Sequence, residues 1–241
     1  MNDALTLAIE TSCPRGSVAL ARGGEPPIVR TLSADRRHAG ELLPTIADLL
    51  GTVGARLADV GLVAFSHGPG SFTGLRVAAT IARTLHSAGG CTVVAVPTLA
   101  VIARNALALP ECPPRVAVLL DARRGQVFGG WFERAGDDFE TREEADLREP
   151  AAWLGGLPRP LGVVGDGLRQ YADVVAAAGV TALPESCWDP RAEHVLALGR
   201  RLAAAGRRCR PEEITPLYIR PPACEEVYEQ RRAEARRRRG E

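Results

Sequence analysis

Two acidic side chains stand at matching places in the chain, each closing an apolar segment just before a tight turn. Glu10 ends the apolar segment that begins at Leu5, and Asp121 ends a similar one that begins at Val116. Carboxylates at strand ends can hold a metal–phosphate complex or a catalytic water, or can simply cap the turn. Asp166, which stands between two glycines, is a third acid with the same two interpretations. Glu10, Asp121 and Asp166 are therefore candidates for an anion or nucleotide contact.

A glycine-rich segment, GPGSFTGLR at Gly68–Arg76, is the strongest local signal of a site. Its glycines permit a sharp turn, and Ser71 is placed to cap a helix that starts near Phe72. Free N–H groups at that helix start could bind an anion, with Gly70 and Ser71 as contacts. Close packing of the helix against a sheet explains the glycines equally well. The segment lacks the Gly-Lys-Ser/Thr ending of a P-loop, and its glycine spacing differs from that of a dinucleotide fingerprint.

The other residues that could bind metals or form covalent intermediates are dispersed. Six cysteines include no C-x-x-C pair, and four histidines show no H-x-x-x-H spacing. This pattern predicts isolated thiols and no metal site. All 30 basic residues are Arg, since the chain contains no Lys. Schiff-base chemistry and a Walker-type phosphate lysine are therefore excluded.

The composition is that of a globular protein. Among 241 residues, 30 are basic and 29 acidic, which gives a net charge of +1; 46% are hydrophobic and 24% charged. These values exclude a disordered chain and argue against a surface devoted to nucleic acid. No apolar stretch approaches the roughly 20 residues that span a bilayer. Residues 1–3 do not begin a secretory signal, so we expect a cytoplasmic protein with no membrane segment.

The elements that must position these residues follow from periodicity and turn signals. In the first half, strands are predicted at 5–10, 17–22, 28–32, 62–66 and 92–96, and helices at 39–50, 72–88 and 98–107. In the second half, strands are predicted at 116–121, 126–133, 138–142, 161–164 and 180–183, and helices at 150–154, 167–178 and 190–205. Both halves read βββαβαβα. This order predicts an α/β protein with two mixed sheets, the architecture of the actin-like ATPase (ribonuclease H-like) fold shared by actin, sugar kinases and Hsp70-type ATPases.

A proline-rich break at Pro110–Pro114 marks the boundary between the halves. Pro216–Pro222 is expected to lie on the core as an extended strap. Arg231–Arg239 holds six Arg and one Glu, a run typical of a solvated tail or of a contact with RNA phosphates. The predicted division is an N-terminal lobe at 1–109 that binds a partner, a C-terminal lobe at 110–220 and an Arg-rich tail at 221–241.

Five segments together resemble the TsaB family. They are Ile9–Ser12, His38 followed by Glu41–Pro44, Gly68–Arg76, Asp121–Gly125 and Pro216–Arg220. The resemblance extends from about Leu5 to Arg220, and Gly68–Arg76 is its most specific part. It implies the actin-like ATPase fold and a non-catalytic, scaffolding role in bacterial synthesis of tRNA threonylcarbamoyladenosine.

The resemblance also implies partners. The paralogous TsaD-type subunit transfers threonylcarbamoyl to adenosine 37 of tRNAs that read codons beginning with A, and a TsaE-type ATPase joins the complex, so tRNA is met indirectly. TsaB proteins pair with TsaD through helices of the N-terminal lobe, here 39–50 and 72–88. The contacts carried over to this chain are Leu42, Leu43, Ile46, Arg76, Ala79 and Arg83. Isolated members can self-associate through the same surface, so the resemblance leaves both a homodimer and a monomer open for the chain alone.

The predicted helix at 98–107 bears on catalysis. TsaD-type enzymes carry two metal-binding histidines one helical turn apart, and this helix contains none. We therefore expect no catalytic residue, no metal ligand and no required cofactor, whereas binding of ATP or ADP stays open. The alternative is an ATP-dependent kinase or ATPase of the same fold using Glu10, Asp121 and Asp166. Glu10 stands where the family commonly has Asp. A nuclease would need a cluster of metal-binding carboxylates, for which the sequence offers two to three candidates at best. A metalloprotease would need metal ligands that the sequence does not supply.

Overall fold

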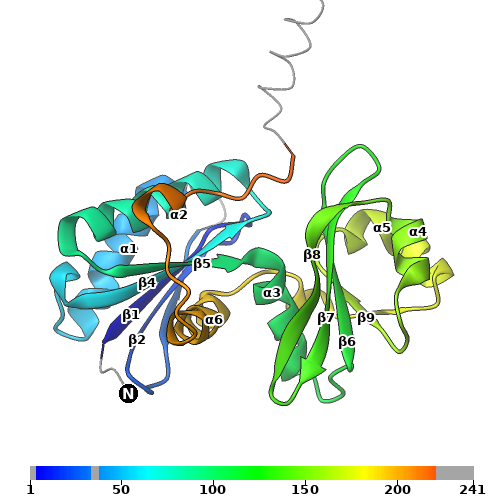
Figure 1. The fold of residues 1–241 in the computed structure, drawn as a ribbon, viewed down its shortest axis with the longest axis horizontal. Coiled ribbons are helices and arrows are strands. Elements are labelled where there is room, and N and C mark those ends of the chain that lie inside the picture. The colour runs from blue at the N-terminus through cyan, green and yellow to red at the C-terminus, as the bar shows by residue number, and fades with distance from the viewer. Residues whose placement is uncertain (1–3, 34–37, 221–241) are drawn as a thin grey trace, which may run out of the picture.

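The computed structural model describes residues 4–33 and 38–220 (Figure 1). The strands are β1 (Leu5–Glu10), β2 (Ser17–Arg22), β3 (Ile28–Thr31), β4 (Val60–Gly68), β5 (Thr92–Pro97), β6 (Arg115–Asp121), β7 (Val127–Ala135), β8 (Asp138–Arg148), β9 (Gly162–Val164) and β10 (Thr181–Ala182). The helices are α1 (His38–Thr52), α2 (Phe72–Gly89), α3 (Thr98–Ala103), α4 (Pro150–Gly156), α5 (Leu168–Ala177) and α6 (Ala192–Ala204). Short 3₁₀ turns lie between them, one of which continues α3 at Arg104–Ala108.

The two sheets repeat one topology. The first has the order β3-β2-β1-β4-β5 and the second β10-β9-β6-β7-β8, which is the same order read from its other edge. In each sheet the first three strands form an antiparallel meander and the last two run parallel to the first. The predicted duplication and the actin-like fold class are confirmed. β8 continues to Arg148, beyond the predicted end at residue 142, because its charged and apolar residues pair with β7 along its length.

Helices α1 and α2 cover one face of the first sheet. Leu42, Ile46 and Leu49 of α1 pack with Leu7 and Ile9 of β1 in one buried cluster. The opposite face is lined by small residues, among them Ala8, Ala19 and Ala64. Because these side chains are short, a helix can approach that face closely.

The helix on that opposite face is α6, which comes from the second half of the chain. Its Val195, Leu196 and Leu198 pack among the small residues of the first sheet. In exchange, α3 from the first half packs on the second sheet, where Leu99 and Ile102 join its buried cluster. Helices α4 and α5 cover the other face of the second sheet. A division at residue 110 therefore separates the two sheets and leaves their hydrophobic cores interlocked, as α3 and α6 in Figure 1 show.

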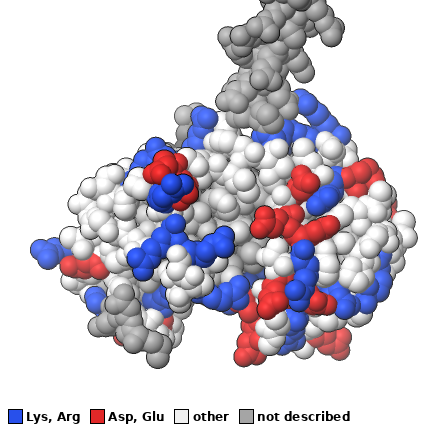
Figure 2. Space-filling view, viewed as in Figure 1, with Lys and Arg blue, Asp and Glu red and all other residues white. Residues whose placement is uncertain are grey.

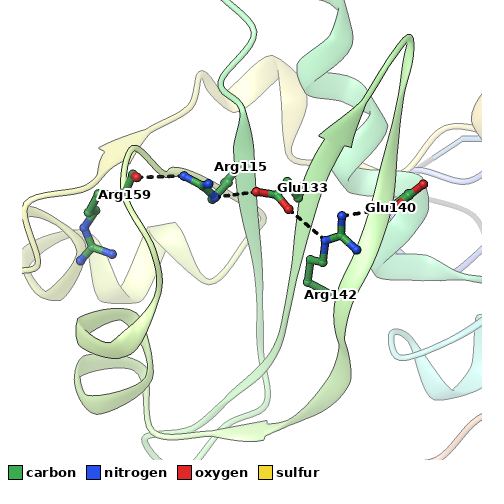
Figure 3. A network of polar contacts seen from close by, with 5 residues as sticks. All are labelled: Arg115, Glu133, Glu140, Arg142 and Arg159. Carbon is green, nitrogen blue, oxygen red and sulfur yellow. Dashed lines mark hydrogen bonds and ion pairs between the residues drawn. The ribbon is translucent and has the colours of Figure 1, made fainter.

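Charged side chains of both signs alternate on the second lobe (Figure 2). Some of them form a chain across its sheet (Figure 3). Glu133 of β7 accepts from Arg115 of β6 at 2.9 Å and from Arg142 of β8 at 3.0 Å, and Arg142 lies 3.3 Å from Glu140. Arg115 also donates to the carbonyl of Arg159 at 2.8 Å. These pairs are partly exposed and tie three strands together without forming a cavity, so we assign them a structural role. No helix in the described ranges is long and apolar enough to cross a membrane.

Candidate functional sites: the inter-lobe cleft and the α1–α2 groove

A cleft of about 470 Å³ lies where β1 of the first sheet and β6 of the second end. Four of the five residues predicted to contact an anion or nucleotide line it: Gly70, Ser71, Asp121 and Asp166. The cleft also contains three arginines that sequence reasoning missed, Arg15, Arg123 and Arg169, and the aromatic Trp188. They come from four separate segments of the chain, and Arg169 lies in α5, so no local motif could have grouped them.

Glu10 does not reach this cleft. Its side chain is fully buried. The backbone N–H of Ser12 donates to Oε1 of Glu10 at 2.6 Å, the Ser12 hydroxyl donates to the same oxygen at 2.5 Å, and the Ser66 hydroxyl bonds to Oε2. Burial raises the pKa of this carboxyl, although the three hydrogen bonds oppose that shift. The prediction of a ligand contact at Glu10 is corrected: the turn at Ser12 stands between the carboxyl and the cleft, and the acid anchors that turn.

Asp121 and Asp166 are engaged with the backbone at the cleft wall. Asp166 accepts from the N–H of Asp121 at 3.0 Å, and Asp121 accepts from the N–H of Arg123 at 2.9 Å. Burial is the main cause that raises the pKa of Asp166; the hydrogen bond from the Asp121 backbone opposes this rise, and the charge of Asp121 adds to it. Asp121 thus caps the turn that follows β6, and Asp166 ties the loop after β9 to the end of β6. Over the described part of the chain, no group of three or more His, Cys, Asp or Glu side chains is placed to hold a metal ion.

The glycine-rich turn at Gly68–Gly74 is pressed against the turn that follows β1. The N–H of Ser71 donates to the carbonyl of Ser12 at 2.7 Å, and the Thr11 hydroxyl donates to the carbonyl of Gly74 at 2.8 Å. A Cβ added to Gly70 would lie 2.5 Å from the Ser12 carbonyl oxygen. Ser71 caps α2 as predicted, its hydroxyl accepting from the N–H of Gly74 at 3.3 Å. Backbone contact therefore accounts for these glycines; anion binding at this turn stays a prediction.

A second hollow, the α1–α2 groove, lies on the outer side of the first lobe. It has a volume of about 410 Å³ and is lined mostly by apolar atoms of Leu43, Phe72, Thr73, Arg76, Val77, Thr80 and Ile81. Leu43 leaves 53% of its surface exposed, whereas the other leucines of α1 and Ile46 are buried in the core. The groove is therefore a candidate surface for a protein partner.

The six predicted partner contacts fall in three places: the groove, the exposed surface of α2 and the core. Leu43 and Arg76 line the groove, and Arg83 is exposed on the same helix, donating to the carbonyl of Ile214 at 2.8 Å. Leu42, Ile46 and Ala79 are 0%, 2% and 4% exposed and belong to the core of the first lobe, so their prediction as contacts is corrected. Leu42 and Ile46 belong to the apolar stripe of α1 that faces the sheet, whereas Leu43 lies beside that stripe and is exposed to solvent.

Known sequences and a solved structure are similar to this chain over most of its length. A family model described as TsaD, tRNA N6-adenosine threonylcarbamoyltransferase, matches residues 29–208. The chain is 29% identical over 218 residues to the tRNA threonylcarbamoyladenosine biosynthesis protein TsaB of Escherichia coli K12, which covers 89% of this chain and 94% of that protein. It is 38% identical over 149 residues to the TsaB protein of Haemophilus influenzae, covering 59% and 62% of the two chains. The solved structure of YeaZ from Pseudomonas aeruginosa superposes with a TM-score of 0.75 at 29% identity, covering 89% of this chain and 99% of that one.

Proposed function

We propose, from the premise that the chain belongs to the TsaB family of tRNA threonylcarbamoyladenosine biosynthesis proteins, that it is a non-catalytic subunit of the tRNA-modifying complex. Its role is to pair with a TsaD-type transferase, with a TsaE-type ATPase joining the assembly. The observation that carries the proposal is the α1–α2 groove, where Leu43 is held exposed beside a row of apolar and small side chains on α2.

The groove has the chemistry of a pairing surface. Its walls are apolar, while Arg76 and the hydroxyls of Thr73 and Thr80 supply polar groups along its length. Interfaces between subunits combine an apolar centre with a polar rim in this way. In the isolated chain the same surface is available to a second copy, so the homodimer is proposed as the alternative use of the groove.

The lack of catalysis is supported by the cleft. Glu10 is shielded from it, Asp121 accepts from the N–H of Arg123, and Asp166 accepts from the N–H of Asp121. Helix α3 and the 3₁₀ turn after it, Thr98–Ala108, contain no histidine to ligate a metal. The kinase or ATPase alternative needs a cleft whose acids reach a metal-bound nucleotide; tight Mg²⁺-dependent nucleotide binding by the isolated chain is the result that would favour it.

The test is light scattering after size-exclusion chromatography, with this protein alone and mixed with its cognate TsaD-type subunit. The variants are Leu43→Glu in the groove and Leu57→Glu as the control. Leu57 is 43% exposed on the same lobe but does not line the groove. We expect wild type and Leu57→Glu to form the heterodimer and Leu43→Glu to lose it. Absence of any complex with folded wild-type protein would refute the proposed function.

A further inference from the structure

The last seven described residues, Ile214–Arg220, cross from one lobe to the other and are called the strap here. In Figure 1 this segment, orange to red, runs over α2 toward the second lobe. We propose that the strap clamps the two lobes together and that its Tyr218 forms part of the pairing surface, with Arg220 as the positioning residue that holds it there. The second half of this proposal rests on the proposed function.

On the first lobe the strap is fixed at three places. Arg83 of α2 donates to the carbonyl of Ile214 at 2.8 Å. The N–H of Leu217 donates to the carbonyl of His67 at 2.7 Å, so the strap makes one backbone hydrogen bond with the end of β4. Ile214 itself is 1% exposed and belongs to the core of this lobe. The strap is therefore a built part of the first lobe.

Tyr218 is the link between the strap and the groove. Its hydroxyl accepts from Nε of Arg76 at 2.9 Å, and its ring lies 5.1 Å from the ring of Phe72. The Arg76 guanidinium stacks over the Phe72 ring at 4.0 Å. Phe72 and Arg76 both line the groove, so Tyr218 rests on two of its walls. Because Tyr218 stays 37% exposed, it extends the groove's apolar surface toward the strap.

Among the residues that the structure describes, Arg220 makes the hydrogen bonds that tie the strap to the second lobe. Its guanidinium donates through one nitrogen to the carbonyl of Ala122 and through the other to the side-chain oxygen of Gln126. Both acceptors lie in the tight turn between β6 and β7, where Arg123 and Arg124 have positive φ angles of 64° and 56°. The guanidinium is planar, so its two donors can reach both acceptors only while the turn keeps one conformation. The pair of hydrogen bonds therefore fixes Arg220 to this turn in a single orientation.

These contacts make Arg220 the residue that links the strap to the second lobe and holds the strap in place. Without it the strap would still be joined to the first lobe but would no longer be tied to the second. The strap end bearing Tyr218 would then sample more positions over Phe72 and Arg76. Binding of a partner would have to order this segment, and the lost conformational entropy would weaken the binding free energy. The lobes would also lose a contact that bridges them on the strap side.

The first experiment measures amide hydrogen exchange of the isolated full chain. In Arg220→Ala we expect exchange at Leu217 and across residues 122–126 to accelerate about tenfold or more, the scale set by losing charge-assisted hydrogen bonds. Arg210→Ala is the matched control, because Arg210 pairs only with the neighbouring Glu212 and Glu213 among described residues. Gln126→Ala, which removes one of the two acceptors, should give a smaller acceleration at the same amides. Unchanged exchange in both Arg220→Ala and Gln126→Ala would overturn the clamp.

The second experiment measures affinity for the cognate TsaD-type subunit. Arg220→Ala and Tyr218→Ala should each weaken pairing about tenfold, and Tyr218→Phe, which keeps the ring stack, should weaken it less. Arg210→Ala should bind as wild type does. Wild-type affinity in Arg220→Ala and Tyr218→Ala would overturn the role in pairing. If wild type forms no complex at all, the proposed function fails, and the exchange experiment still decides whether the strap joins the lobes.

Discussion

The Thr11 hydroxyl donates to the carbonyl of Gly74 across 2.8 Å, and the space between the two backbones leaves no room for a side chain. A Cβ on Gly74 would lie 1.8 Å from the Thr11 carbonyl oxygen. This contact joins the turn after β1 to the first turn of α2, and so holds the wall of the cleft and the end of the groove in one piece.

Gly74→Ala should therefore destabilise the protein by at least about 2 kcal/mol, because the rigid backbone of Thr11 cannot yield to the methyl group. Gly51→Ala is the control: Gly51 lies in α1 with open space around its Cα, so alanine there should stabilise by about 0.5–1 kcal/mol. Urea unfolding followed by circular dichroism measures both changes. Equal stability of the two variants would contradict the close contact.

Adjacent leucines on α1 should behave oppositely. Leu42 is fully buried and Leu43 is 53% exposed, so Leu42→Ala should cost about 2–5 kcal/mol of unfolding free energy and Leu43→Ala no more than about 0.5 kcal/mol. Binding to the TsaD-type subunit should show the reverse order among folded variants, with Leu43→Ala the weaker binder. Thermal unfolding and isothermal titration on the same samples check the two rankings. A stability loss at Leu43 as large as that at Leu42 would mean that Leu43 is a core residue.

His194 on α6 should make the protein sensitive to mild acid. Burial, with Arg104 and Arg191 nearby, lowers its pKa to about 4, although Asp138 opposes the shift. The unfolded chain takes up a proton near pH 6.5 and the folded chain does not until about pH 4, so unfolding becomes easier as pH falls between these values. The stability lost through this residue approaches about 3 kcal/mol at pH 4, at about 1.4 kcal/mol per pH unit.

The measurement compares wild type with His194→Gln in urea unfolding from pH 7 to pH 4. We expect the variant to lose less stability than wild type over that range, so that the difference between them changes steadily with pH. A difference that does not vary with pH would show that His194 takes up its proton in the folded state as readily as in the unfolded one.

Glu10 should give the opposite pH dependence. Its folded pKa is raised, so the folded chain keeps the proton at pH values where the unfolded chain has already released it. Stability contributed by Glu10 is present in acid and is lost as pH rises above about 4.5, the ordinary value for this acid. Glu10→Gln retains an acceptor for Ser12 and has no proton to lose. Its stability relative to wild type should therefore increase from pH 4.5 toward neutrality, and a flat difference would contradict the raised pKa.

The order of strands and helices could be predicted from sequence because its signals are local. Alternating residues such as Leu5, Leu7 and Ile9 identify a strand wherever it packs, and Ser71 marks a helix start through its own backbone contacts. Which sheet a helix covers is a long-range property. The apolar patterns of α3 and α6 are compatible with packing on either sheet. The small side chains of Ala8, Ala19 and Ala64 are what allow α6 to pack closely on the first sheet.

The candidate sites were harder to predict, for two physical reasons. Glu10 and Asp121 occupy equivalent strand ends, but whether the next turn folds over the carboxyl depends on backbone contacts with the distant Gly70 and Gly74. The run of apolar residues in α1 predicts one surface, whereas in the structure Leu42 and Ile46 face the sheet and Leu43 faces outward. A helical wheel would have separated them, since neighbouring residues lie about 100° apart around the helix.

The exchange of α3 and α6 between the lobes bears on how the chain is made. While a ribosome is still synthesising residues 192–204, one face of the first sheet is covered only in part, by Val101 of α3. The helix that packs on Ala8, Ala19 and Ala64 is encoded more than a hundred residues later. Gly199 must then arrive directly against Ala64, where a Cβ would lie 2.3 Å from the alanine methyl. Neither half can complete its hydrophobic core alone, so the first lobe reaches its native packing only after residues 192–204 have been synthesised. Truncation at residue 109 should yield an aggregating or protease-sensitive product rather than an isolated lobe.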